Sequence, residues 1–146
     1  MLQRSQTVYL LLAAGLLVLL FALGHVWTPS VESVSPVLGK LIYGLTAAAA
    51  TVALGAVFLY KDRKRQRTVI GYAQWIALAV LVPLLVGLFA ASPDSSASTA
   101  GSVDAIGLYG RYLVALIPLV AYGLLRMARG GVDRDIATVR SMDRLR

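Results

Sequence analysis

Long apolar runs alternate with short polar and charged segments along the chain, and four of the runs are long enough to predict membrane-spanning helices. They cover residues 7–26, 41–60, 68–91 and 106–125, and Arg111 is the one residue within them that carries a formal charge at neutral pH. Each run has about the 20 residues that a helix needs to cross a hydrocarbon layer of ~30 Å. The runs do not alternate between polar and apolar positions as membrane β-strands do. The pattern therefore predicts an all-α, polytopic membrane protein with four transmembrane helices.

Basic residues gather in the segments that flank alternate ends of these runs. Residues 1–6, 61–67 and 126–146 hold every Lys and Arg except Lys40 and Arg111. The loops at 27–40 and 92–105 are almost free of basic residues. Because Lys and Arg accumulate in cytoplasmic loops, this distribution predicts that both termini and the 61–67 loop are cytoplasmic.

Glycines and prolines predict where the helices bend or end. Gly130 and Gly131 are expected to end the fourth helix, so that a short cytoplasmic helix restarts within the tail 126–146. Pro83 and Pro118 lie inside the third and fourth apolar runs and predict static bends there; the alternative is that these kinks mark a gated path as in transporters.

Composition excludes a soluble enzyme and leaves a single domain over residues 1–146. The chain is 58% hydrophobic and only 14% charged, whereas a soluble domain has about a quarter of its residues charged. Without cysteine it has no disulfides, thiolate metal sites or iron–sulfur clusters. The net charge of +7 raises the question of nucleic acid, but no aromatic residue is interleaved with the charges of 61–67. We therefore interpret the charge as a determinant of orientation and expect no nucleic-acid partner.

Chemistry-bearing residues are sparse. A haem held between helices needs two axial ligands and the chain has one histidine, His25, so we expect no metal and no cofactor. No Asp or Glu lies within the four runs, which argues against an ion-coupled pump. The runs also lack a paired nucleophile and base, so we do not expect an enzyme. His25, Asp104 and Arg111 form one candidate polar cluster at the outer interface, suited to a quinol headgroup or similar ligand. The alternative is that His25 forms a local hydrogen bond while Arg111 extends outward on its own.

Small residues form a stripe on one face of the second predicted helix. Gly44, Ala48, Thr51 and Gly55 are spaced four, three and four residues apart, which lets a neighbouring helix approach the backbone closely. That neighbour belongs either to the same four-helix unit or to another subunit.

The two ends of the chain carry short motifs that resemble those of one family. The opening MLQRSQTVYLLLAA and the closing VRSMDRLR are similar to the ends of the bacterial domain-of-unknown-function family numbered 4293. The resemblance implies a small four-helix protein of the bacterial cytoplasmic (inner) membrane, and it implies no activity. It also suggests that the two cytoplasmic ends meet, with Gln3 and Arg4 contacting Asp143 and Arg144.

Together these features predict a non-catalytic accessory or structural subunit. Its expected partners are membrane lipids and the other subunits of a larger respiratory or transport complex. The alternative is a small transporter, a channel, or a lipid- or quinone-binding membrane protein.

Overall fold

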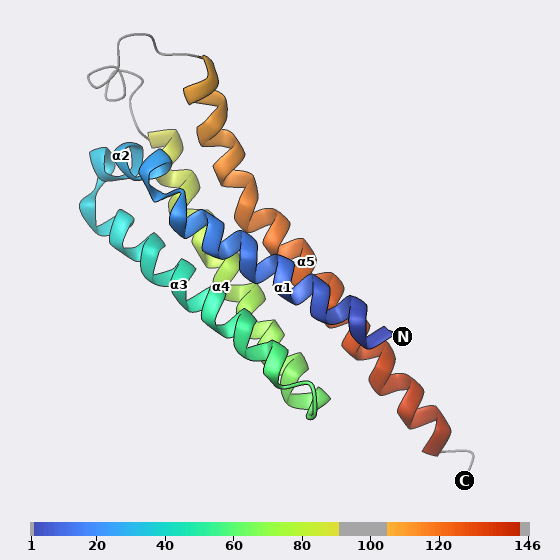
Figure 1. The fold of residues 1–146 in the computed structure, drawn as a ribbon. Helices are drawn as coiled ribbons and strands as arrows, with labels where there is room; N and C mark the ends of the chain where they lie inside the picture. Colours follow the sequence, from blue (N-terminus) through green and yellow to red (C-terminus); the bar gives the residue numbers. More distant parts are fainter. Residues whose placement is uncertain (1, 91–104, 144–146) are drawn as a thin grey trace.

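A computed structural model describes residues 2–90 and 105–143, and this part of the chain is entirely helical apart from short turns (Figure 1). Its helices are α1 (Leu2–Ala22), α2 (Gly24–Val34), α3 (Pro36–Phe58), α4 (Arg63–Ala90) and α5 (Ala105–Asp143). Three stretches are long and apolar enough to cross a membrane: α3, α4 and Tyr112–Ser141 of α5. A fourth span results if Gln6–Ala22 and Gly24–Val34, which meet at a bend of 61°, count as one. The all-helical fold predicted from the apolar runs is confirmed.

The four long helices form a bundle in which each packs against two neighbours. Helix α1 contacts α3 and α5, and α4 also contacts α3 and α5. In Figure 1 the N-terminus, the α3–α4 turn and the last part of α5 lie at one end. We call this the basic end, because it holds the residues from 61 to 67 and from 126 to 143. Helix α2 lies at the opposite end, beside the end of α4, and we call this the α2 end.

Alanine is the most frequent buried residue in the bundle, and many large apolar side chains lie outside. Eleven alanines on four helices are buried, at positions 13, 14, 49, 50, 53, 56, 73, 77, 115, 121 and 128. Phe58, Trp75 and Phe89 are 79%, 70% and 69% exposed, and many leucines and valines are also exposed. Small interior side chains let the helix backbones approach closely.

Helix α2 occupies part of the segment that we expected to be a loop at 27–40. Trp27 is fully buried, and its indole Nε1 donates a hydrogen bond to the Leu20 carbonyl at 3.2 Å. Val31 is also buried, and a Cβ on Gly87 would lie 2.5 Å from its Cγ2 atom. The loop prediction failed because a helix that covers the end of a bundle needs only one narrow apolar side, here Trp27 and Val31.

The start of α3 follows local sequence rules. Ser35 has an extended backbone, and its hydroxyl accepts a hydrogen bond from the Val37 N–H at 3.3 Å. Pro36 follows at the first helical position, where the missing N–H costs nothing.

Gly130 and Gly131 do not interrupt α5, so the predicted break and separate tail helix are wrong. The helix runs through both glycines to Asp143. Gly131 faces α1, where a Cβ would lie 2.6 Å from the Cγ atom of Gln6. The glycine therefore provides room for a neighbouring helix, and the buried Val132 next to it continues the packing. Pro83 and Pro118 also lie inside helices, and both are buried.

Candidate functional site

A network of polar side chains joins three helices at the basic end. Asp135 of α5 has a side chain only 12% exposed, and its Oδ2 atom lies 2.8 Å from Nη1 of Arg63 in α4. The same oxygen accepts a hydrogen bond from Nε2 of Gln6 in α1 at 3.0 Å. We call Gln6, Arg63 and Asp135 the basic-end triad. It fixes the start of α1 and the start of α4 to α5.

A cavity of about 450 Å³ lies beside the triad. Its lining is Gln6, Thr7, Val8, Tyr60, Arg63, Gln66 and Asp135. The buried Gln66 donates from Nε2 to the Ala56 carbonyl at 3.1 Å, which ties α4 back to the end of α3. These polar groups bond to one another and to the backbone, so the arrangement is suited to holding helices together.

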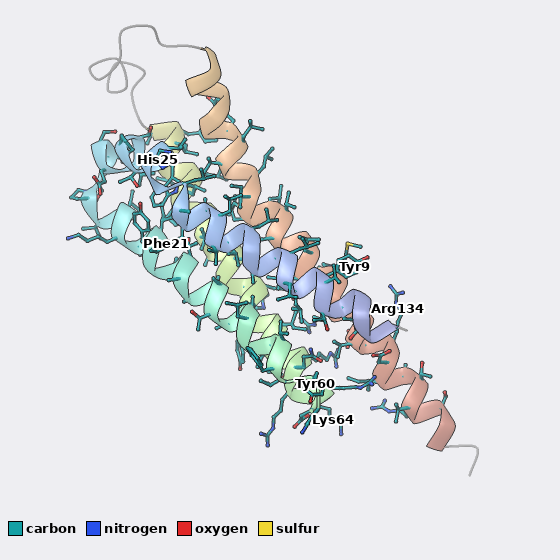
Figure 2. All side chains as sticks on the ribbon, in the orientation of Figure 1. Tyr9, Phe21, His25, Tyr60, Lys64 and Arg134 are labelled. Atoms are coloured by element: carbon teal, nitrogen blue, oxygen red, sulfur yellow. The ribbon has the colours of Figure 1, made fainter. Side chains whose placement is uncertain are left out.

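The residues from 61 to 67, expected as a loop, lie mostly in the first turns of α4. The helix begins at Arg63 because Asp62 accepts a hydrogen bond from the Arg65 N–H at 3.2 Å and thereby caps the first turn. Figure 2 places Lys64, Tyr60 and Arg134 at this end of the bundle, and His25 and Phe21 toward the α2 end.

A second hollow, the α4–α5 groove, lies between those two helices near the basic end. It has a volume of about 400 Å³ and is lined by Arg67, Thr68, Gly71, Tyr72, Trp75 and Arg129. Arg67 pairs with Asp133 at 2.6 Å, while Arg129 donates to Oε1 of Gln74 at 3.2 Å. Gln74 is buried, and its own Nε2 donor has no hydrogen-bond partner.

The small-residue stripe of α3 faces away from the bundle. Gly44, Ala48 and Thr51 are exposed and Gly55 is half-buried. In the part of the chain that the structure describes, nothing lies within 4 Å of the position that a Cβ would take on Gly44 or Gly55. The neighbouring helices of the same chain pack instead on the face that carries Ala49, Ala53 and Ala56. We expected this stripe to pack against a helix of the same four-helix unit or of another subunit. The described helices of the same unit do not cover it.

The predicted outer-interface cluster falls largely outside the described residues. His25 is exposed near the start of α2, whereas Asp104 and the side chain of Arg111 lie outside the described part. The same holds for the predicted contact between the chain ends, because the side chains of Gln3, Arg4 and Asp143 and the whole of Arg144 are not described. The first turns of α1 do lie against α5, through Gln6 and Asp135.

Sequence reasoning missed the basic-end triad. Gln6 belongs to the opening motif, which was the one available signal. Asp135 was assigned to a detached tail helix, and that assignment separated it from Arg63. Among the described residues, no group of three or more His, Asp or Glu side chains is arranged to hold a metal ion.

The fold and these sites define a class: an all-helical chain with three or four helices able to span a membrane and a polar network at one end of the bundle. A comparison with family models gives a match over residues 2–145 to Domain of unknown function (DUF4293). The chain belongs to this family, which confirms the resemblance drawn from its two ends. No curated protein and no solved structure matches the chain.

Proposed function

We propose that the chain is a non-catalytic, multi-pass protein of the bacterial inner membrane, with both termini in the cytoplasm. We further propose that it packs as a small accessory subunit against a larger respiratory or transport complex. The first statement concerns its location and the second its role, and different observations support each.

The distribution of side chains supports the membrane location. Large apolar residues cover the outside of all four long helices, for example Val8, Phe58, Trp75 and Leu113. A soluble monomer with contiguous apolar surface of this extent would aggregate, whereas lipid is a good solvent for it. The alanine interior fits helices that associate by close packing, as they do in lipid.

The charges support the orientation. The basic end carries Lys61, Lys64, Arg65 and Arg134, all exposed, and a cytoplasmic location satisfies the positive-inside rule for the termini and the α3–α4 turn together.

One observation carries the proposed role as a subunit: the outward stripe of α3. A row of glycine, alanine and threonine on an exposed helix face leaves a shallow path for a second helix, and the bundle's own core does not use it. Such rows are typical of faces where transmembrane helices meet. The accessory subunit is therefore expected to contact its complex through α3.

Photo-crosslinking in native membranes tests this role. A benzoylphenylalanine residue in place of Ala48 should form an adduct with one discrete membrane protein. The same residue in place of Val82, an exposed position on α4, should not. Gly44→Leu should abolish the adduct at position 48 without unfolding the chain, because no described residue lies within 4 Å of the place where the new side chain begins.

Two outcomes would refute the role. One is a self-adduct at position 48 with no other protein, which indicates a homodimer. The other is an equal yield of adducts at positions 48 and 82, which indicates contact with lipid and chance neighbours.

A further inference from the structure

Arg129 in the α4–α5 groove is a half-buried cation without a carboxylate partner. Its hydrogen bond goes to the neutral amide of Gln74, and no described carboxylate pairs with it. The two acidic residues that follow on α5, Asp133 and Asp135, pair with Arg67 and Arg63 instead. A guanidinium has five N–H donors, so most of those on Arg129 are left for another acceptor. Partial burial of an unpaired charge is unfavourable unless an anion accompanies it.

The groove is shaped to admit such an anion beside Arg129. Gly71 forms part of its wall, and a Cβ there would lie 3.3 Å from Nη1 of Arg129. The absence of a side chain at Gly71 therefore keeps the guanidinium accessible across α4. Arg67 lines the same hollow one turn before Gly71, but it is paired with Asp133, so Arg129 is the cation left for an anion there.

Two aromatic side chains continue the groove along the outside of α4. Tyr72 is 62% exposed and Trp75 is 70% exposed, and both line the hollow. Tyrosine and tryptophan at a membrane–water interface pack their rings against acyl chains and direct their polar atoms to the headgroups. The groove thus offers the Arg129 guanidinium for a phosphate and aromatic rings for the acyl chains attached to it.

We propose that the α4–α5 groove binds an anionic phospholipid of the cytoplasmic leaflet, with its phosphate at Arg129 and its acyl chains along Trp75. The proposal rests on the membrane location proposed above. The aromatic rings favour a lipid over free phosphate, since free phosphate gains nothing from them.

Native mass spectrometry of the full chain after reconstitution tests the proposal. Nanodiscs of phosphatidylcholine, with or without added phosphatidylglycerol, supply the probes, and inorganic phosphate in excess is the competitor. Phosphatidylglycerol should stay bound after detergent extraction, phosphatidylcholine should not, and phosphate should not displace the lipid. Arg129→Gln should lower lipid retention about tenfold, which corresponds to about 1.4 kcal/mol.

Matched variants separate this site from general attraction to basic residues. Arg126→Gln removes the same charge three residues earlier on α5, at an exposed position outside the groove, and should leave retention unchanged. Trp75→Leu should weaken retention without affecting the fold, because Trp75 is mostly exposed.

Equal losses in Arg129→Gln and Arg126→Gln would overturn the proposal, as would equal retention of phosphatidylcholine. Displacement by inorganic phosphate would assign the groove to a soluble anion instead. If the chain stays outside the nanodiscs altogether, the membrane location itself fails. If it inserts without selecting phosphatidylglycerol, only the lipid site fails.

Discussion

Single polar side chains at the basic end determine how the helices are held relative to one another. One carboxylate oxygen of Asp135 forms an ion pair with Arg63 and accepts a hydrogen bond from Gln6, and the Asp135 side chain is only 12% exposed. The Asp62–Arg65 pair lies nearby on α4, but its side chains are 49% and 81% exposed. Pairs in water contribute little to stability, and partly buried ones with several hydrogen bonds contribute more. The two aspartates are therefore expected to respond differently to the same substitution.

Asp135→Asn should lower the free energy of unfolding by about 1–3 kcal/mol, because it leaves Arg63 without its counter-charge. Asp62→Asn should change it by less than about 0.5 kcal/mol, since the amide keeps the helix cap and the lost ion pair is exposed. Thermal unfolding of both variants in the same detergent measures the difference. Equal effects would mean that the triad contributes no more than a surface ion pair.

Individual residues also show what could not be predicted at the site. The pattern of charges predicted that the basic segments lie together, but the choice of Asp135 over Asp133 for Arg63 depends on the phase of α5. That phase depends in turn on whether the helix continues through Gly130 and Gly131. A sequence with two consecutive glycines favours a break on local grounds, and only the Gln6 side chain packed against Gly131 shows why the helix continues.

Among the helices, the ones defined by long apolar runs were the predictable ones. The runs at 41–60 and 68–91 correspond to Pro36–Phe58 and Arg63–Ala90, which begin earlier than predicted and end one or two residues earlier. Helix α2 was missed because its sequence, GHVWTPSVESV, is too polar and too short to be distinguished from a loop. The sequence also could not predict which face of α3 packs against the bundle, because residues 47–50 are all alanine and place small side chains on every face of the helix.

The adjacent glycines of α5 provide a test within one helix. Gly130→Ala should raise the free energy of unfolding by up to about 1 kcal/mol, because alanine is the better helix former and its Cβ meets nothing within 4 Å. Gly131→Ala should lower it by about 1 kcal/mol or more, because the new methyl group displaces Gln6 from Asp135. Thermal unfolding gives the sign for each variant, and the same sign for both would contradict the packing of α1 on Gly131.

The molecule as a whole has one basic end and one α2 end, and the proposed orientation assigns each to a side of the membrane. Because the natural chain has no cysteine, a single introduced thiol reports its own accessibility without background. Ser33 at the α2 end and Lys64 at the basic end are both exposed and suit this purpose.

Ser33→Cys should react with a membrane-impermeant maleimide on intact spheroplasts, and Lys64→Cys should react only after lysis. This result follows if the basic end is cytoplasmic. The reverse labelling pattern would show that the orientation is the opposite of the one proposed. Equal labelling of both thiols on intact spheroplasts would contradict a membrane-spanning chain.

The alanine interior has a consequence for the entropy of assembly. A leucine or methionine loses rotamer freedom when it is fixed between helices, whereas alanine has no side-chain rotamers to lose. Each buried alanine of this bundle therefore spares the rotamer entropy that a buried leucine such as Leu10 or Leu17 loses. In the proposed membrane location this saving would favour association of the helices, because lipid provides no hydrophobic force to bring them together.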